Sequence, residues 1–315
     1  MTDLSTDLAP SNPKSLRLRN PVMTASGTFG YGIEFAKLLD VQRLGAIICK
    51  GTTLRPRRGN PQPRLVETTA GLLNAIGLQN IGVKALIREK APIWATWEVP
   101  VIVNVAGETL EEYVAVAGSL EGVAGVSGIE LNISCPNVAR GGAAFGSDCK
   151  TAAEVTAAVR AVTTLPLVVK LTPNVVNIGE IAAAVCEAGA DAVSLINTLV
   201  GLRIDIRARR PLLGNITGGL SGPAVKPVAL RLVYEVARAV DKPVVGVGGI
   251  CTAADALEFI MAGASAVQVG TANFVNPRAS LDVLDGIVEF MEREGVRHIG
   301  ELIGVAQVPQ EERIV

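Results

Sequence analysis

Histidine is almost absent from this sequence. The 315-residue chain contains a single histidine, His298, which lies in a charged segment near the C-terminus. Histidine is the side chain that most often carries protons near neutral pH. Any acid–base chemistry performed by this chain must therefore rely on another residue type, and a well-placed cysteine becomes the first candidate.

Aromatic residues are also scarce, at 3% of the chain, and charged residues make up only 19%. Apolar residues reach 49%, so the core has to be built mainly from valine, isoleucine, leucine and alanine. Such a composition is typical of parallel β-strands that are covered by helices on both faces.

The chain lacks an excess of charge of either sign, with 29 basic and 30 acidic residues and a net charge of −1. A nucleic-acid-binding protein would be expected to show a basic surplus or a basic stripe, and neither is present. No window approaches the roughly 18 uninterrupted apolar residues of a membrane span. Residues 1–20 also lack the apolar centre of a signal peptide. We therefore expect a cytoplasmic protein that binds neither membrane nor nucleic acid.

Paired cysteine motifs are missing as well. The five cysteines are scattered at Cys49, Cys135, Cys149, Cys186 and Cys251, with no Cys-x-x-Cys and no histidine at zinc-ligand spacing. We therefore predict no metal site. An odd, dispersed set of cysteines in a chain of this length favours a reducing compartment.

What the sequence does contain is a regular alternation of short apolar runs and helical patterns. The predicted strands are Val22–Ala25, Ala46–Cys49, Val101–Val105, Ile129–Leu131, Leu167–Leu171, Ala192–Ile196, Val244–Val247 and Ala266–Val269. The predicted helices are Ile33–Leu39, Gly82–Lys90, Leu110–Leu120, Ala152–Val162, Ile178–Ala188, Val225–Ala239, Ala253–Met261 and Ser280–Glu294. This alternation predicts one α/β domain over residues 1–315 with the (β/α)₈ TIM-barrel fold. A doubly wound open sheet is the competitor, but no Gly-x-Gly-x-x-Gly follows the first strand.

Three longer segments without periodicity interrupt the alternation, at residues 51–80, 136–150 and 200–223. Each follows a predicted strand, so each is expected on the C-terminal face of the barrel. Loops of this length in a compact domain are usually lids or binding loops.

Polar residues recur where the predicted strands end, at Lys50, Asn104, Asn132, Lys170 and Asn197. Each alone could simply cap a strand in solvent. Together they predict a common pocket, because the carboxyl ends of barrel strands meet at one mouth. Carboxamides offer both donors and acceptors and suit a ring with alternating N–H and C=O groups, such as an imide or pyrimidine. The lysines could bind a carboxylate and stabilise a developing negative charge.

The last two strands are followed by glycine instead, in Gly248-Gly249 and Gly270-Thr271. Barrel enzymes often bind phosphate with backbone N–H groups of these two loops. Either pair alone is a weak signal, since glycine is common in turns. Their coincidence in these two positions predicts a phosphate site.

Cys135 lies in the turn Asn132-Ile133-Ser134-Cys135-Pro136-Asn137, just beyond a predicted strand. Most lone cysteines are inert buried residues, and we interpret Cys49, Cys186 and Cys251 in that way. Cys135 differs because it occupies a polar turn at the predicted mouth. As a general base it would act as a thiolate, and an ordinary thiol pKa of about 8.5 would favour activity above neutral pH.

Taken together, these segments resemble the class 1 dihydroorotate dehydrogenases, and specifically the class 1B catalytic subunit, from about residue 20 to residue 304. The segments that carry the resemblance are Met23–Gly30, Lys50–Thr53, Asn74–Asn80, Asn132–Asn137, Lys170–Asn174, Ile196–Val200, Gly218–Pro227 and the two glycine loops.

The resemblance implies FMN-dependent oxidation of dihydroorotate to orotate in pyrimidine biosynthesis. It implies that Cys135 removes the proton from C5 of dihydroorotate while hydride leaves C6 for the flavin. The implied flavin-binding residues are Ser26, Lys50, Gly51, Asn104, Asn132, Lys170, Ile196, Gly222, Gly248, Gly249, Gly270 and Thr271. The implied substrate-binding residues are Lys50, Asn74, Ala75, Ile76, Gly77, Leu78, Asn132, Asn197 and Thr198.

Class 1B membership implies a partner subunit that carries FAD and a [2Fe–2S] cluster and reduces NAD⁺, around a homodimeric core within a heterotetramer. This chain has no cysteine cluster for iron–sulfur ligation, so the cluster belongs in the partner. Class 1A enzymes, homodimers that reduce fumarate, remain the alternative. Class 2 enzymes use a serine base and an N-terminal membrane segment, which this sequence lacks. Cys149 departs from the proline usual in relatives, and neither it nor His298 receives a role.

There are three other interpretations. Lys170 at a strand end, with phosphate-binding glycines beyond it, would also suit a Schiff-base aldolase. Dihydropyrimidine dehydrogenases share a cysteine turn, but a histidine is expected there in place of Asn137. The chain could also be a barrel without activity that serves as a scaffold, although the complete set of polar strand ends argues against this.

Overall fold

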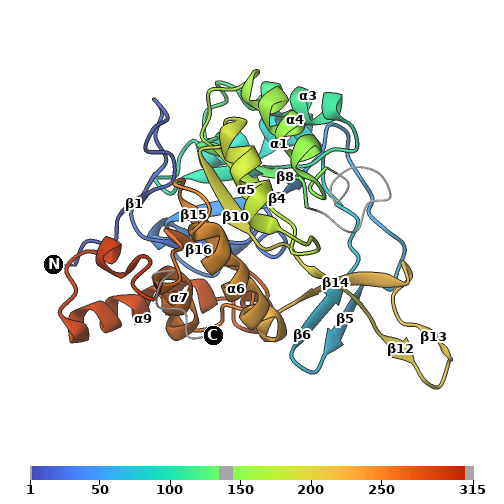
Figure 1. Ribbon diagram of the computed structural model, residues 1–315. Coiled ribbons are helices and arrows are strands. Elements are labelled where there is room, and N and C mark those ends of the chain that lie inside the picture. The colour runs from blue at the N-terminus through green and yellow to red at the C-terminus, as the bar shows by residue number, and fades with distance from the viewer. Residues whose placement is uncertain (1, 135–144, 309–315) are drawn as a thin grey trace.

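The computed structural model describes residues 2–134 and 145–308. These residues form a closed barrel of eight parallel strands (Figure 1). In chain order the strands are β3 (Val22–Thr24), β4 (Ala46–Thr52), β7 (Val101–Val105), β8 (Gly128–Asn132), β9 (Leu167–Lys170), β10 (Ala192–Leu195), β15 (Val244–Val247) and β16 (Ala266–Val269). The predicted TIM barrel is confirmed, and each predicted strand coincides with one of these to within a few residues.

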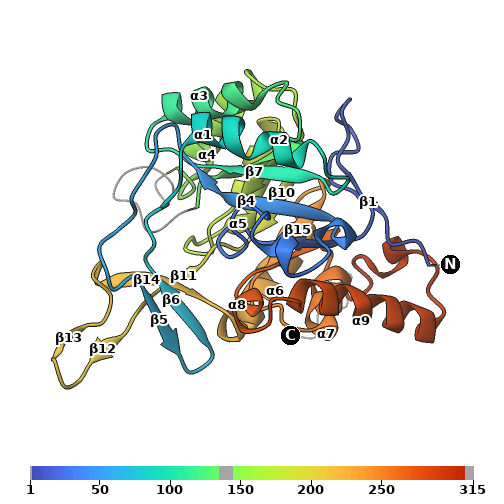
Figure 2. The same cartoon turned by 180° about the vertical axis from the view of Figure 1, so that it is seen from behind.

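Helices surround the barrel, as the views from the front and from behind show (Figures 1 and 2). They are α1 (Val83–Glu89), α2 (Ala91–Trp94), α3 (Leu110–Leu120), α4 (Cys149–Arg160), α5 (Ile178–Glu187), α6 (Lys226–Ala237), α7 (Ala253–Met261), α8 (Ala272–Val275) and α9 (Ala279–Glu294). Local sequence sets where they begin. Thr252, for example, caps α7 and forms a reciprocal capping box with Asp255. In the described part of the chain no helix is both long and apolar enough to span a membrane.

The prediction of a helix at Ile33–Leu39, between the first two barrel strands, is wrong. The structure has two 3₁₀ turns there, Phe35–Lys37 and Val41–Arg43. Gly32, at φ 80°, precedes the first turn, and the Asp40 side chain caps the second by accepting from the Gln42 N–H.

Alternate residues of each barrel strand face two different parts of the core. Val22, Ile47 and Val101 pack outward into the layer beneath the helices. Their neighbours face the barrel interior in another cluster made by Leu8, Ala9, Leu16, Leu18, Met23, Ala25, Ala46, Ile48, Ile102, Val168, Ala192, Val245, Val247 and Ala266. Four of these come from the N-terminal hairpin β1 (Thr6–Asp7) and β2 (Arg17–Leu18) and its turn. The hairpin therefore packs onto the barrel interior, and the opposite end of the strands remains for a ligand.

A second sheet projects from the barrel, in the order β11 (Leu199–Leu202), β14 (Thr217–Ser221), β6 (Gly71–Asn74) and β5 (Leu65–Thr68) (Figures 1 and 2). A two-stranded extension, β12 (Ile204–Asp205) and β13 (Arg210–Pro211), continues from it. The segments 51–80 and 200–223 were predicted to lack regular structure, and that prediction is wrong for these strands. We call the four strands β11, β14, β6 and β5 the small sheet.

Candidate active site

A cavity of about 430 Å³ lies at the carboxyl ends of the barrel strands, beside the small sheet. The polar strand ends Lys50, Asn104, Asn132, Lys170 and Asn197 all line it. The prediction that they share one pocket is therefore confirmed. Its volume is in the range of ordinary cofactor and small-molecule sites.

Most other residues predicted for the site line the same cavity: Ser26, Gly51, Asn74, Ile76, Gly77, Leu78, Ile196, Thr198, Gly222, Gly248, Gly249, Gly270 and Thr271. Ala75 does not line it, because its side chain is fully buried in a small apolar cluster with Leu73 and Leu213. Cys135 lies outside the described residues, so its role stays a prediction. The described chain ends at Ser134, directly before it.

One edge of the cavity is made of backbone. Gly248 and Gly249 follow β15 with φ values of 128° and 77°, which side chains rarely tolerate. A Cβ on Gly249 would lie 2.7 Å from Cβ of Lys226. Gly270 follows β16, and the short helix α8 begins two residues later. Two glycine loops and a short extra helix in these positions are the arrangement in which TIM barrels bind phosphate.

The cavity wall formed by the small sheet and the loop after β6 is largely apolar. Leu72 and Leu220 come from β6 and β14, and Ile76 and Leu78 come from the loop. The cavity therefore has an apolar wall in addition to the polar strand ends. Such a division suits a flat ring with polar atoms along its edges.

Lys50 at the end of β4 is partly withdrawn from water, and burial lowers the pKa of its ammonium below the usual 10.5. The positive charge of Arg64 lowers this pKa further. A cation held in this way gains by contact with an anion, because the anion compensates for lost hydration. Lys50 is thus suited to bind the carboxylate or phosphate of a ligand.

Behind the lining residues Lys170 and Asn104 lies a buried acidic residue that the sequence analysis missed. Glu130 on β8 is fully buried, and its carboxylate lies 3.6 Å from Nζ of Lys170. It accepts hydrogen bonds from Asn104 Nδ2 at 2.7 Å, Ser194 Oγ at 3.0 Å and Gln268 Nε2 at 2.6 Å. The signal was present in the sequence, since Glu130 and Gln268 are polar residues in the middle of apolar strands.

The described cysteines differ in their surroundings. Cys49 is buried, and burial raises the pKa of its thiol to about 12. Burial also raises the pKa of Cys186, to about 11. Cys186 and Cys251 are both only partly buried, so their interpretation as buried residues is wrong, and Cys251 also lines the cavity. Cys149 is the first residue of α4. Among the described residues, no group of three or more histidine, cysteine, aspartate or glutamate side chains could hold a metal ion.

Comparison with known proteins identifies the family. The model of the family "Dihydroorotate dehydrogenase" matches residues 10–291. The chain belongs to the dihydroorotate dehydrogenase family. The resemblance found in the sequence is confirmed. The Schiff-base aldolase interpretation loses its support, because the Lys170 ammonium is paired with Glu130 in a barrel of this family.

The dihydroorotate dehydrogenase family includes close relatives of this chain. It is 58% identical over 302 residues to a protein of Geotalea uraniireducens, a match that covers 96% of this chain and 97% of the relative. It is 56% identical over 296 residues to a protein of Pelobacter propionicus, covering 94% and 97%. It is 56% identical over 293 residues to a protein of Desulforamulus reducens, covering 93% and 96%. All three relatives are named "Dihydroorotate dehydrogenase B (NAD(+)), catalytic subunit".

Proposed function

We propose that this chain is the catalytic subunit of a class 1B dihydroorotate dehydrogenase. It oxidises dihydroorotate to orotate in pyrimidine biosynthesis, and NAD⁺ is the final electron acceptor. The observation that carries the proposal is the cavity that joins four asparagines and two lysines to a glycine-rich edge. The relatives, whose names state this activity, match the chain over almost its whole length.

FMN is the cofactor that we propose for this cavity, and the residues present fit it. The phosphate would lie against the backbone of Gly248, Gly249, Gly270 and Thr271, where side chains are absent or small. The ring would lie among Ser26, Lys50, Gly51, Asn104, Asn132, Lys170, Ile196 and Gly222. When bound, FMN would supply the acceptor for the hydride removed from the substrate. Lys170 would place a positive charge beside the ring and so favour electron uptake.

Dihydroorotate is a cyclic imide with a carboxylate, and the remaining lining matches those groups. We propose that Lys50 pairs with the carboxylate. Asn74, Asn132 and Asn197 offer carboxamides to the alternating N–H and C=O groups, and Thr198 and the segment 76–78 complete the contact. Cys135 is the proposed base that removes the proton from C5.

The electrons must leave this chain for NAD⁺, and we propose that they do so through a partner subunit with FAD and a [2Fe–2S] cluster. The relatives are named as a "catalytic subunit", which supports a multisubunit enzyme. We further propose a homodimeric core within a heterotetramer, and a cytoplasmic location.

Anaerobic reduction tests the activity. The purified chain is expected to carry a flavin absorption band that is bleached by dihydroorotate. A protein with no flavin, or with a flavin that dihydroorotate leaves oxidised, would refute the proposal.

Co-purification from the native source tests the acceptor. We expect an iron–sulfur flavoprotein to travel with the chain, and we expect the complex, but not the isolated chain, to reduce NAD⁺ with dihydroorotate. Efficient fumarate reduction by the isolated chain would instead favour a class 1A enzyme.

A further inference from the structure

The carboxamides of the cavity are not independent, because they belong to one continuous chain of hydrogen bonds. Asn104 Nδ2 donates to Glu130 Oε1 at 2.7 Å, and Asn132 Nδ2 donates to Asn104 Oδ1 at 3.2 Å. Ser134 Oγ donates to Asn132 Oδ1 at 3.0 Å, and Asn197 Nδ2 donates to Ser134 Oγ at 2.9 Å. Five side chains from three strand ends therefore share one network.

The two ends of this chain fix its direction. At one end the backbone N–H of Thr198 donates to Asn197 Oδ1 at 2.9 Å, and a backbone N–H can only donate. At the other end Glu130 accepts all its hydrogen bonds. Every intermediate group must then accept on the Thr198 side and donate on the Glu130 side. No carboxamide can turn over without leaving two donors or two acceptors in contact.

A shorter branch confirms that Glu130 acts as an acceptor. The ammonium of Lys170 can only donate, and it lies 3.4 Å from Gln268 Oε1. The nitrogen of Gln268 must therefore face Glu130, to which it donates at 2.6 Å. Both branches begin at the same buried carboxylate and end at residues that line the cavity, Lys170 on one side and Asn132 and Asn197 on the other.

The direction of the chain determines what the cavity offers a ligand. Asn132 Oδ1 already accepts from the Ser134 hydroxyl at 3.0 Å and from the Ser134 N–H at 3.3 Å. The hydrogen-bonding capacity that Asn132 retains is the second N–H of its amide. Asn132 is thereby set to meet an acceptor, such as a ring carbonyl oxygen.

We propose that Glu130 is a positioning residue that fixes the orientation of the carboxamides in the active site. It contacts no substrate, and it acts through Asn104 on Asn132, Ser134 and Asn197. Its place beneath the mouth lets one buried charge order both the substrate-binding carboxamides and Lys170. This inference rests on the proposed function, because it specifies how that site recognises its ring.

Glu130→Gln tests the proposal in the FMN-loaded enzyme. The glutamine fills the same volume but must place an NH₂ group against a donor, Asn104 or Gln268, so that a branch loses its order. We expect orotate, titrated at saturating FMN through the change in flavin absorbance, to bind about tenfold more weakly. Ser194→Ala is the matched control. It removes another hydrogen bond to the same carboxylate but leaves the chain intact, and orotate affinity should stay within about twofold of the parent.

A double-mutant cycle distinguishes positioning from a general structural effect. Ser134→Ala cuts the chain midway and has no contact with Glu130. If orientation passes along the chain, the loss caused by Glu130→Gln should be clearly smaller in the Ser134→Ala background. The proposal would be overturned if the fold-losses in orotate affinity of the two single variants simply multiplied in the double variant. It would also be overturned by a Glu130→Gln enzyme with parental orotate affinity.

If Glu130→Gln does not fold, Ser134→Ala alone decides, since parental orotate affinity in that variant would also overturn the proposal. A parent enzyme that binds no orotate would refute the proposed function itself, and so the two failures are distinguishable.

Discussion

The ammonium of Lys170 lies 3.6 Å from the carboxylate of Glu130, and the two side chains are 5% and 0% exposed. Removing one member of a buried pair leaves the other charge without compensation, which typically costs about 3–5 kcal/mol. We therefore expect Lys170→Met to lower the free energy of unfolding by about that amount in urea titrations. It should also slow reduction of the flavin by dihydroorotate.

The double variant Lys170→Met, Glu130→Gln distinguishes the cost of an unpaired buried carboxylate from the cost of removing the lysine side chain. It removes both charges, and it should be more stable than Lys170→Met alone because no carboxylate is left buried without a cation. A double variant that is less stable than the single one would contradict this account. Lys150→Met is the surface control. Its pair with Glu154 is 4.0 Å long and exposed, so its loss should cost less than about 0.5 kcal/mol.

Cys135 is expected to be the catalytic base, because the chain offers almost no histidine for this role. Cys135→Ala should abolish dihydroorotate oxidation while FMN stays bound, and Cys135→Ser should leave a weak enzyme with a higher pH optimum, because a hydroxyl is the poorer acid. Stopped-flow reduction of the flavin across pH measures both. Cys186→Ser on α5 is the control and should behave as the parent. Near-parental turnover in Cys135→Ala would disprove the assignment.

The lowered pKa of Lys50 predicts a pH limit for binding of the anionic product. Burial disfavours the charged ammonium, so in the free enzyme Lys50 loses its proton below pH 10.5. Orotate affinity should stay constant below the lowered pKa and fall as pH rises through it, because the neutral amine no longer pairs with the carboxylate. Orotate titrations from neutral to alkaline pH measure this fall.

Lys50→Arg provides the comparison, since the guanidinium keeps its charge throughout that range. The orotate affinity of Lys50→Arg should not show the decrease that deprotonation of Lys50 causes in the parent. Any effect from titration of orotate itself would appear in both enzymes and so cancel in the comparison. Parallel pH profiles for the two proteins would show that Lys50 does not bind the carboxylate.

The barrel could be predicted from the sequence because its signals are local. Most of each strand, such as Val101–Val105, is apolar, and a polar residue near its C-terminal end, such as Asn104, marks the mouth. The small sheet could not be predicted in this way. Leu73 on β6 pairs with Leu220 on β14, far along the chain, and β5 and β11 are partly exposed on both faces, so they show no buried run.

The site was predictable by residue type and not by orientation. Asn132 and Asn197 could be assigned to one pocket from their places after two strands. The direction of their hydrogen bonds depends on the Thr198 N–H and on Glu130, and only the three-dimensional structure brings these together. Ala75 shows the converse, because its neighbours in the motif line the cavity while its own side chain faces a separate cluster.

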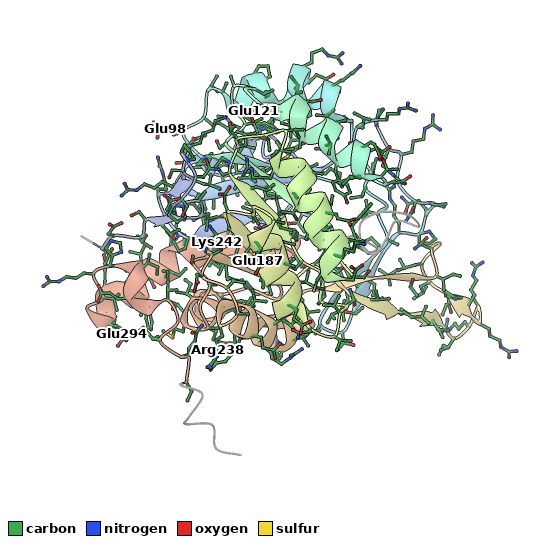
Figure 3. All side chains as sticks on the ribbon, turned by 45° about the horizontal axis from the view of Figure 1, so that its top comes forward. Glu98, Glu121, Glu187, Arg238, Lys242 and Glu294 are labelled. Atoms are coloured by element: carbon green, nitrogen blue, oxygen red, sulfur yellow. The ribbon has the colours of Figure 1, made fainter. Side chains whose placement is uncertain are left out.

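Glu121 at the C-terminal end of α3 is predicted to stabilise the fold in a pH-dependent way (Figure 3). Hydrogen bonds from Lys14, from the Thr163 hydroxyl and from the hydroxyl and N–H of Thr164 hold the pKa of its carboxyl well below the usual 4.5. A depressed pKa in the folded state gives stability that is present above pH 4.5 and lost as pH falls. Glu121→Gln should therefore cost up to about 1 kcal/mol at neutral pH, because the carboxylate is a third exposed and solvent weakens its interactions.

The difference between Glu121→Gln and the parent should shrink as urea titrations are repeated at lower pH. Glu98→Gln is the matched control, because Glu98 is 79% exposed and pairs only with Arg19 in the described structure. Its effect should be small at every pH. A constant difference between Glu121→Gln and the parent from neutral to acid pH would refute the linkage.

Gly249→Ala is expected to weaken FMN binding through the backbone of the phosphate edge. Gly249 has φ 77°, and the new Cβ would lie 2.7 Å from Cβ and 2.8 Å from the backbone nitrogen of Lys226, so the loop must move. Gly295→Ala is the matched control. It has φ 71° at the end of α9 and an open space around the new Cβ. It therefore carries the same backbone strain of about 1–2 kcal/mol, but without a steric clash and outside the ligand cavity.

Fluorescence titration of the flavin-free proteins should show FMN bound at least about tenfold more weakly by Gly249→Ala and at parental strength by Gly295→Ala, since displacing the loop removes backbone N–H donors from the phosphate. Equal FMN affinity in the two variants would mean that the phosphate does not rest on this loop.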